Sequence, residues 1–201
     1  MANAKATRQA LRKQYIRARE EISPAEREMY SLRAAERIVS LPEFREASVV
    51  MLYRAVRGEM NLDALPERPE AAGKLLVYPR CVDREKMTAM IPAGWEPGAF
   101  GIPEPAEGSE TVPPERIGLV ICPGTAFDGM GGRLGMGAGY YDRFLPKCVN
   151  AVFLMAAFSA QRAEELPLDE TDVRMDLIAT EDGILRIRKG GAHAPDDPVL
   201  H

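Results

Sequence analysis

The sequence predicts an α/β fold in three layers, with a mainly parallel sheet flanked by helices. Short apolar runs alternate along the chain with segments of helical periodicity, which is the order typical of such folds. The apolar runs are continuous, as expected for strands that are covered on both faces. A glycine-rich loop follows one run and precedes a helix. We therefore expect a phosphate-binding loop at the carboxyl end of a strand, where open α/β sheets bind ligands.

The composition fits one globular domain that is large enough to bury a core. The chain has 201 residues, of which 46% are hydrophobic and 28% are charged. We expect a single α/β domain over residues 1–188, followed by a disordered polar tail over residues 189–201. The chain has no apolar run of about 18 residues, so no membrane span is expected. The polar, basic N-terminal segment lacks the apolar core of a secretory signal.

Charge and cysteine content restrict the partners and the compartment. The net charge is −4 at pH 7, which argues against non-specific binding of nucleic acid. The chain has three cysteines, an odd number, and they are widely spaced at Cys81, Cys122 and Cys148. We therefore expect reduced thiols in a cytoplasmic protein, without a disulfide framework or a cysteine metal site. We further expect a monomer whose partners are small molecules, with no nucleic-acid or membrane partner.

Two helices are expected at the start of the chain. Residues 4–21 carry apolar side chains on one helical stripe and basic side chains on an adjacent stripe. The apolar stripe consists of Leu11, Tyr15, Ala18 and Ile22, and the basic stripe consists of Lys5, Arg8, Arg12 and Arg19. Ser23 and Glu26 form a capping-box pattern around Pro24, which predicts the start of a second helix over residues 24–40.

Apolar runs predict the strands of the sheet. They cover residues 48–53, 74–78, 86–91, 117–122, 150–158 and 176–180. A short helix interrupted by proline is expected near residues 61–72. The segment 92–115 is rich in proline and glycine. We interpret it as an ordered loop that crosses the sheet, with Trp95, Phe100 and Ile102 as apolar anchors.

The glycine-rich segment is the most informative part of the sequence. Residues 124–139 hold seven of the 17 glycines, where average usage predicts about one. The segment follows the strand expected at 117–122 and precedes a helix expected over 140–147. Glycines allow the backbone to approach an anion closely, and the amides at a helix start point toward it, so this arrangement predicts a phosphate cradle. The segment lacks the lysine of the P-loop and fits the dinucleotide-binding pattern poorly.

The same segment resembles the signature of the 5-formyltetrahydrofolate cyclo-ligase family. The matching residues are Pro123-Gly124-Thr125-Ala126-Phe127-Asp128 and the run from Gly131 to Asp142. Further similar motifs occur in the family's order at Arg8 to Arg12, Gly58-Glu59, Pro79-Arg80, Phe100 to Pro105 and Leu166 to Asp176. The resemblance therefore spans residues 5–180. The chain departs from the family pattern at Met136, Ala138 and Thr171.

The resemblance implies a ligase of folate one-carbon metabolism. Members of the family convert 5-formyltetrahydrofolate to 5,10-methenyltetrahydrofolate with ATP and Mg²⁺, and they release ADP and phosphate. ATP phosphorylates the formyl oxygen, and N10 then attacks the formyl carbon as phosphate departs. Phosphoryl transfer of this kind needs a backbone cradle, cations and a metal ion held by carboxylates.

The site residues follow from the resemblance and from the chemistry of each side chain. Arg133, whose guanidinium suits a bidentate contact with phosphate, and Tyr141 are the catalytic candidates. ATP is expected to contact Arg8, Arg12, Arg133, Leu134, Gly135, Met136, Gly137, Ala138, Gly139 and Tyr140. The folate is expected to contact Glu59, Met136 and Tyr141. Asp142 and Asp172 are expected to bind Mg²⁺, with Asp176 as the alternative to Asp172.

Two other functions fit the same residues. The departures at Met136, Ala138 and Thr171 favour a protein that binds folate or nucleotide without turnover. A sugar-phosphate or acyl-CoA enzyme on a similar scaffold would need a general base near the cradle, for which Glu59 is the obvious residue. Asp128 is interpreted separately, as an acceptor that braces its own loop.

Overall fold

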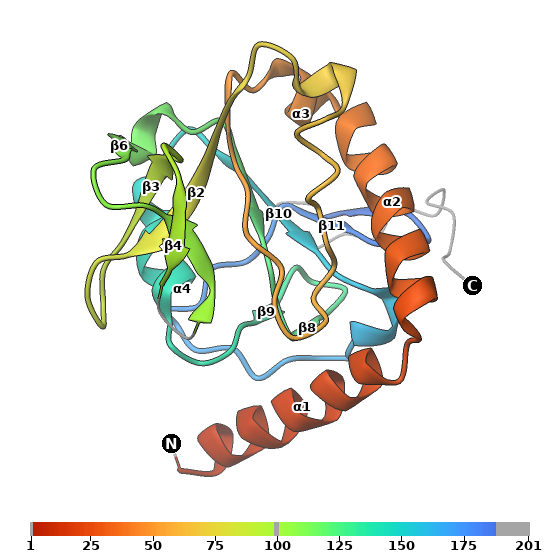
Figure 1. Ribbon diagram of the computed structural model, residues 1–201. Coiled ribbons are helices and arrows are strands. Elements are labelled where there is room, and N and C mark those ends of the chain that lie inside the picture. The colour runs from red at the N-terminus through yellow and green to blue at the C-terminus, as the bar shows by residue number, and fades with distance from the viewer. Residues whose placement is uncertain (1, 99–100, 188–201) are drawn as a thin grey trace.

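The computed structural model describes residues 2–98 and 101–187, and the tail expected over residues 189–201 lies outside them. The described residues form one eight-stranded sheet and two small two-stranded sheets. No helix in this part of the chain is both long and apolar enough to cross a membrane. Figure 1 shows the large sheet in the middle of the molecule with helices around it.

Five parallel strands form the centre of the large sheet. They are β1 (Val49–Met51), β2 (Leu75–Cys81), β7 (Leu119–Cys122), β10 (Val152–Ala156) and β11 (Leu177–Ala179). Antiparallel strands extend both edges, namely β3 (Met87–Ile91) and β6 (Glu110–Val112) beyond β2, and β12 (Ile184–Arg186) beside β11. The strand order is β12-β11-β10-β7-β1-β2-β3-β6. The predicted mainly parallel sheet is confirmed.

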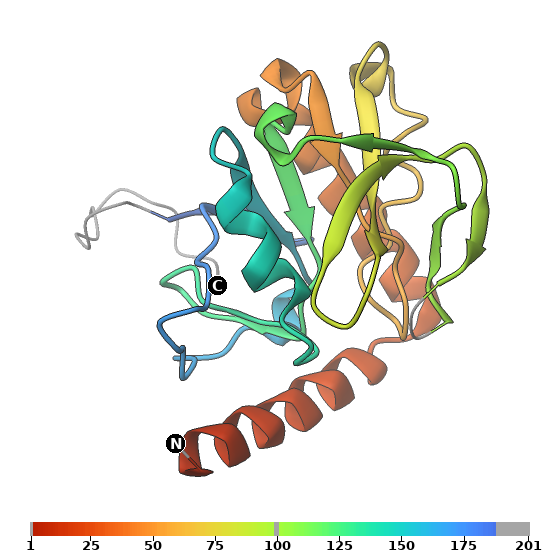
Figure 2. The ribbon, with the colours of Figure 1, turned by 90° about the vertical axis from the view of Figure 1, so that its left-hand side faces the viewer.

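Helices cover both faces of this sheet. α2 (Pro24–Ser40) lies on one face, and α4 (Tyr140–Phe144) with the following 3-10 helix (Leu145–Lys147) lies on the other (Figures 1 and 2). The Ser23 hydroxyl accepts the N–H of Glu26, and the Glu26 carboxylate accepts the N–H of Ser23. This capping box begins α2 where the sequence predicts it.

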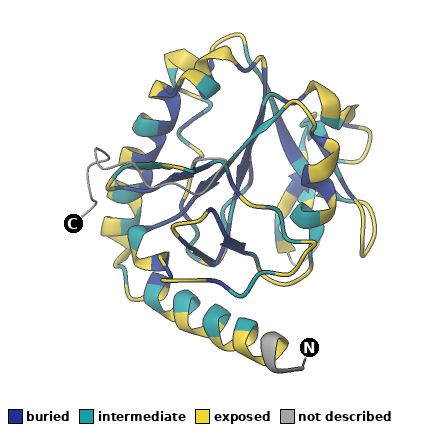
Figure 3. Cartoon of the chain, turned by 180° about the vertical axis from the view of Figure 1, so that it is seen from behind, coloured by how far each residue is buried: buried dark blue, intermediate teal, exposed yellow. Residues whose placement is uncertain are grey.

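Alternate side chains of the central strands enter two separate cores, one on each face. In β7, Leu119 and Ile121 join the core beneath α2, whereas Val120 and Cys122 join the core beneath α4. All four side chains are buried because β7 is covered on both faces. Figure 3 shows the same arrangement, with buried strands inside and exposed outer sides on the helices. The predicted three layers are therefore present.

The N-terminal helix lies outside these layers. α1 (Ala2–Glu20) runs across the end of the molecule at which the parallel strands finish (Figures 1 and 2). It contacts β8 (Ala126–Phe127), which follows β7, and the 3-10 helix Ser159–Gln161, which follows β10. Leu11 and Tyr15 of its apolar stripe pack against a third, smaller apolar cluster. The helix thereby brings its basic stripe to the carboxyl end of the sheet.

The prediction of a short helix near residues 61–72 is wrong. This stretch forms turns and ends in a 3-10 helix at Pro69–Ala71. Proline lacks the amide donor that the interior of a helix needs, so the prolines here favour turns. The sequence analysis also missed a short helix, α3 (Pro42–Glu46), in which Pro42 occupies the first helical position.

The predicted loop over residues 92–115 contains three short strands. β4 (Trp95–Pro97) pairs with β5 (Pro103–Pro105), and β6 extends the main sheet. Prolines are tolerated in such edge strands because only one side of the strand needs amide donors. Trp95 is 44% exposed and contacts the ring of Tyr78 edge-on. The anchor predicted at Phe100 lies outside the described residues.

Candidate active site

A large cavity lies at the carboxyl ends of β1, β2 and β7. Its volume is about 1370 Å³, which exceeds the roughly 300–1,000 Å³ typical of small-molecule pockets. The walls come from α1, from the segments at the ends of the three strands, from residues 133–143 and from residues 169–173. Open α/β sheets bind ligands at this position.

The glycine-rich segment forms one wall of the cavity. β8 pairs with β9 (Arg133–Leu134), and residues 135–139 then lead into α4. Gly137 and Gly139 have φ angles of +103° and +71°, a region that favours glycine. A Cβ atom on Gly137 would lie 3.3 Å from Cζ of Arg12. Glycine at this position therefore also permits the close approach of α1.

Asp128 braces this segment from inside. Its carboxylate accepts the backbone N–H groups of Gly132 at 2.8 Å, Met130 at 2.9 Å and Leu166 at 3.0 Å. The residue is buried and is absent from the cavity wall in the described part of the chain. The interpretation of Asp128 as a loop-bracing acceptor is confirmed.

Arg133 brings a buried positive charge to the wall of the cavity. Its residue exposure is 3%, and its Nη2 donates to Oδ1 of Asp142 at 2.7 Å. The guanidinium also lies 5.4 Å from the ring centre of Tyr141. Nη1 reaches the carbonyl oxygen of Pro123 at 3.4 Å, and Nε has no hydrogen-bond partner among the described residues. Nη1 of Arg133 is therefore the donor from which a bound anion can accept a hydrogen bond, whereas Nε is buried.

The two tyrosines beside Arg133 have different surroundings. Burial raises the pKa of the Tyr141 phenol well above its ordinary value, so Tyr141 is a neutral group at physiological pH. Tyr140 instead donates its hydroxyl to the carbonyl oxygen of Asp83 at 2.8 Å. Arg143 donates to the carbonyl oxygen of Glu85 at the same distance. The turn between β2 and β3 is thus attached to the start of α4 at the rim of the cavity.

Arg8 and Arg12 reach the cavity from one side of α1. Arg8 forms ion pairs with Asp169 and with Asp172, whose Oδ1 lies 2.8 Å from Nη2. The hydrogen bond to Asp172 raises the pKa of Arg8. Nε of Arg12 donates to the carbonyl oxygen of Gly135 at 2.8 Å. Burial lowers the pKa of Arg12, and the positive charge of Arg8 adds to this effect.

The predicted metal ligands differ in position. Asp142 and Asp172 both line the cavity, and each already pairs with an arginine. Asp176 does not line it, because its carboxylate accepts the N–H of Phe153 at 2.9 Å between β10 and β11. No group of three or more His, Cys, Asp or Glu side chains among the described residues could hold a metal ion. The two carboxylates fit a Mg²⁺ ion that arrives with phosphate oxygens as further ligands.

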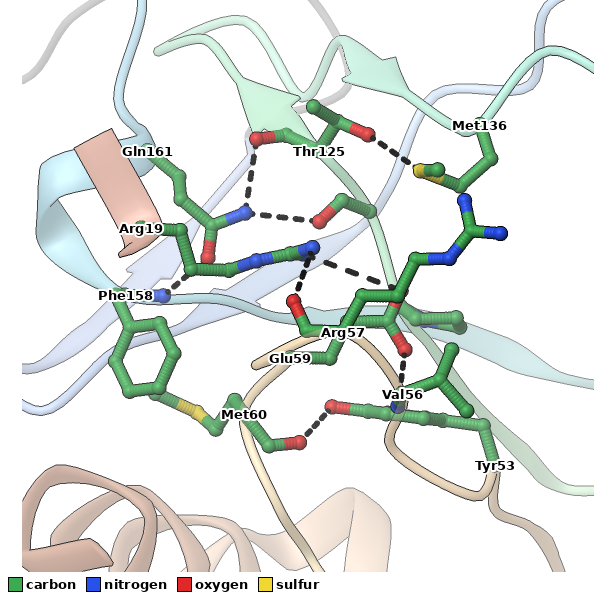
Figure 4. A network of polar contacts seen from close by, with 12 residues as sticks. Arg19, Tyr53, Val56, Arg57, Glu59, Met60, Thr125, Met136, Phe158 and Gln161 are labelled. Carbon is green, nitrogen blue, oxygen red and sulfur yellow. Dashed lines mark hydrogen bonds and ion pairs between the residues drawn. The ribbon is translucent and has the colours of Figure 1, made fainter. Parts of the chain in front are cut away.

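Glu59 lies in the turn that follows β1 and faces the same cavity (Figure 4). Its Oε2 accepts the N–H of Val56 at 3.1 Å, and its Oε1 lies 4.0 Å from Nη1 of Arg19. Burial is the main cause of a raised pKa at Glu59, and the nearby arginines oppose it. Glu59 is distant in sequence from Arg8, Arg12 and Arg133, but the fold places all four residues in the wall of the same cavity.

The remaining predicted residues have mixed positions. Met136 and Ala138 line the cavity, and the Met136 sulfur accepts the Thr125 hydroxyl at 3.4 Å. Leu134 is fully buried in the small apolar cluster beside α1, and it is not among the described residues that line the cavity. The structure therefore does not bring Leu134 to the cavity with the other predicted ATP-binding residues.

The comparisons with known proteins identify the family of this chain. The model of the 5-formyltetrahydrofolate cyclo-ligase family matches residues 4–181. The chain belongs to this family. The 5-formyltetrahydrofolate cyclo-ligase of Mus musculus is 28% identical over 185 residues, which cover 85% of this chain and 90% of that relative.

Two solved structures share the fold of this chain. The structure of Aquifex aeolicus 5,10-methenyltetrahydrofolate synthetase is 37% identical with a TM-score of 0.79, and it covers 94% of this chain and 97% of that chain. A synthetase from Mycoplasma pneumoniae, 24% identical, shares the fold with a TM-score of 0.72 over 87% of this chain and 98% of that chain.

Membership of the cyclo-ligase family confirms the predicted enzyme class. The chain is a ligase of folate one-carbon metabolism, and its family uses ATP as co-substrate. The roles of single residues stay predictions. The sequence analysis placed Arg19 only on a basic stripe, and it missed the burial of this side chain behind Glu59. Helical periodicity placed Arg19 beside the buried edge, which is the one signal that pointed toward its burial.

Proposed function

We propose that the protein catalyses the ATP- and Mg²⁺-dependent cyclisation of 5-formyltetrahydrofolate to 5,10-methenyltetrahydrofolate, with release of ADP and phosphate. One observation carries this proposal. A single cavity is lined by a cationic wall, formed by Arg133 with Arg8 and Arg12, and by the buried carboxyl group of Glu59. The positive charges of the arginine wall suit a triphosphate. The carboxyl group of Glu59 suits the N–H donors of a reduced pterin.

The cationic wall supports the assignment of the triphosphate. The weakly bonded Nη1 of Arg133 offers a donor beside the glycine-rich segment. Gly137 and Gly139 let the backbone of that segment approach a phosphate closely. Arg8 and Arg12 add positive charge from α1. Charge on the transferred phosphoryl group is therefore balanced by residues from two separate parts of the chain.

Glu59 and Tyr141 support the assignment of the folate. A carboxylate accepts two adjacent N–H groups, and a reduced pterin presents such donors. Tyr141 stays protonated because burial raises the pKa of its phenol well above the ordinary value. It therefore offers a neutral ring and a hydroxyl donor beside Arg133, and it is not a general base. Met136 lies on the same wall and completes the predicted folate contacts.

Mg²⁺ would be held by Asp142 and Asp172 together with phosphate oxygens and water. When bound, the ion neutralises phosphate charge and orients the triphosphate. Both carboxylates are paired with arginines, Asp142 with Arg133 and Asp172 with Arg8. The arginines keep the two carboxylates at the cavity wall without placing two bare negative charges there.

The reaction then has two parts. The formyl oxygen attacks the γ-phosphorus of ATP, a P–O bond forms, and ADP departs. N10 attacks the activated formyl carbon, loses its proton, and the C–O bond breaks as phosphate leaves with the original formyl oxygen. The chain contributes mainly position and positive charge, which are the chief requirements of phosphoryl transfer.

The product gives a direct test. The conjugated methenyl product absorbs near the ultraviolet–visible boundary, whereas 5-formyltetrahydrofolate does not. We expect this band to grow when purified protein is mixed with 5-formyltetrahydrofolate, ATP and Mg²⁺, and to stay absent when ATP is left out. A flat trace from folded protein would contradict the proposal. Calorimetry with the folate and with ATP would then identify a protein that binds without turnover.

A further inference from the structure

Arg19 is the most completely buried charged side chain that the proposed reaction leaves unused. It occupies the last turn of α1 and is 1% exposed, although α1 is otherwise a polar helix. Its Nη2 donates to the carbonyl oxygen of Arg57 at 2.9 Å. Nε and Nη1 make no hydrogen bond within the described residues. Burial of an arginine is unfavourable unless its charge is compensated, so its partner is informative.

The partner is Glu59. Among the described residues, Arg19 forms its one ion pair with this carboxylate, with Nη1 and Oε1 4.0 Å apart. Figure 4 shows both side chains converging with the backbone of Arg57. Glu59 lines the cavity, whereas Arg19 is not part of the cavity wall in the described chain. Arg19 can therefore act on a bound ligand only through the residues that it holds.

Arg19 also fixes the turn that carries Glu59. The N–H of Glu59 donates to the carbonyl oxygen of Val56 at 3.0 Å, and the two central residues, Arg57 and Gly58, have φ angles of +50° and +74°. A positive φ is unfavourable for arginine. The hydrogen bond from Arg19 to the Arg57 carbonyl oxygen offsets part of this cost.

We propose that Arg19 is a positioning residue for folate binding, which holds the Glu59 carboxylate and its turn in the orientation that faces the cavity. This inference rests on the proposed function, because it needs Glu59 to contact the folate. It adds a residue that touches neither substrate. It also gives the end of α1 a role on the folate side, separate from that of Arg8 and Arg12 on the nucleotide side.

The charged and titratable groups around Glu59 decide what a loss of Arg19 does. They are Arg19 from α1, Arg57 in its own turn, Tyr53 after β1 and Tyr141 from α4. Burial raises the pKa of both phenols, so both tyrosines stay neutral. Removal of Arg19 leaves Arg57 as the one arginine in this set that opposes protonation of Glu59.

The first experiment compares Arg19→Met with Arg17→Met. Arg17 lies in the same last turn of α1 but is exposed, so it controls for loss of one charge from the helix. We expect Arg19→Met to raise KM for 5-formyltetrahydrofolate by roughly tenfold or more, with KM for ATP within about twofold. The acid limb of kcat/KM should move to higher pH. Arg19→Lys should recover part of the loss, and Arg17→Met should behave as wild type.

A double-mutant cycle covers the case in which Arg19→Met fails to fold. Arg19→Met/Glu59→Gln removes both buried charges, and such neutral replacements of a buried pair are well tolerated. If Arg19 acts through Glu59, the double variant has the same folate KM as Glu59→Gln alone. A folate KM that is higher in the double variant than in Glu59→Gln would overturn the proposal, because Arg19 would then act independently of Glu59.

The outcomes separate this proposal from the proposed function. An active wild type with an unaffected Arg19→Met variant overturns the positioning role alone. An inactive wild type that still binds 5-formyltetrahydrofolate in calorimetry overturns the proposed reaction, and the same variants then test Arg19 through the dissociation constant. A wild type that neither reacts with the folate nor binds it overturns both.

Discussion

Arg133 and Glu59 are buried residues with opposite charges, and each is compensated only in part. Arg133 has a close ion pair with Asp142 at 2.7 Å but leaves Nε unpaired. Glu59 has a hydrogen bond from Val56 but only a distant ion pair with Arg19 at 4.0 Å. Incomplete compensation of this kind is typical of groups whose remaining capacity is used by a ligand.

At Arg133, the shape of the guanidinium is expected to matter more than its charge. Arg133→Lys keeps the positive charge but removes the fork that reaches both Asp142 and a phosphate. We predict a fall in kcat/KM of about 100-fold or more, the magnitude typical of a lost transition-state donor. Steady-state kinetics measures kcat/KM of the variant, and thermal unfolding checks that the variant is folded. The exposed Arg116 offers the control Arg116→Lys. Activity of Arg133→Lys within threefold of wild type would refute the assignment.

At Glu59, the raised pKa predicts a pH dependence of folate binding. The carboxylate form accepts the pterin N–H groups, so binding is strong above the pKa of the folded protein and weakens as the pH falls through it. Burial raises this pKa above the ordinary value of about 4.3. KM for 5-formyltetrahydrofolate, measured from neutral to acidic pH with ATP saturating, should therefore increase toward low pH. In Glu59→Gln the same KM should be high at every pH. A wild-type KM that does not change with pH would contradict this role.

At the scale of elements, α1 connects the two halves of the site. Arg8 and Arg12 lie in the middle part of α1, Arg19 lies in its last turn, and the rise of an α-helix separates Arg8 from Arg19 by about 16 Å along the axis. The helix is held by apolar contacts of Leu11 and Tyr15. One straight element therefore sets the distance between the nucleotide wall and the Glu59 turn.

The glycine-rich segment gives a prediction at the same scale. A methyl group in Gly137→Ala would be strained at φ +103° and would lie 3.3 Å from Cζ of Arg12. Gly73→Ala is the matched control, because Gly73 has φ +78° but no atom within 4 Å of the added Cβ. Both variants should lose similar stability in thermal unfolding, whereas only Gly137→Ala should raise KM for ATP. Equal KM values for ATP in the two variants would show that this wall does not bind the nucleotide.

Helices and strands that are determined by neighbouring residues could be predicted from the sequence. Features that depend on contacts between distant parts of the chain could not. The continuous apolar run of β7 and the capping box at Ser23 gave correct positions from neighbouring residues alone. β4 and β5 were missed because their pairing partners are short, proline-containing edge strands. The sequence placed Arg19 on the basic stripe of its helix but did not predict its burial, since this burial depends on a turn 38 residues further along the chain.

At the scale of the whole molecule, the site exists only because the sheet gathers distant segments. The carboxyl ends of β1 and β7 bring the turn of Glu59 beside the glycine-rich wall, and the segment 169–173 returns to α1 through Asp172. The rule for open α/β sheets predicted this edge from sequence. It did not predict the ion pairs of Arg8 with Asp169 and Asp172, because these join residues more than a hundred positions apart.

This assembly predicts that Mg²⁺ binds with the nucleotide and not before it. Asp142 and Asp172 are both paired with arginines, and no set of three metal-ligating side chains occurs among the described residues. Calorimetric titration with MgCl₂ should therefore show weak or no binding to the free protein. Clear binding should appear when a non-hydrolysable ATP analogue is present, and it should be lost in Asp142→Asn. Tight binding of Mg²⁺ to the free protein would contradict this account.

The fate of the formyl oxygen tests the central claim most directly. 5-Formyltetrahydrofolate labelled with ¹⁸O in the formyl group is converted with unlabelled ATP in unlabelled water, and the released phosphate is analysed by mass spectrometry. If the cavity brings the γ-phosphate to the formyl oxygen, the label appears in inorganic phosphate, one atom for each turnover. If the label appears in water and the phosphate is unlabelled, ATP hydrolysis and cyclisation are separate events, and a shared site for phosphoryl transfer is wrong.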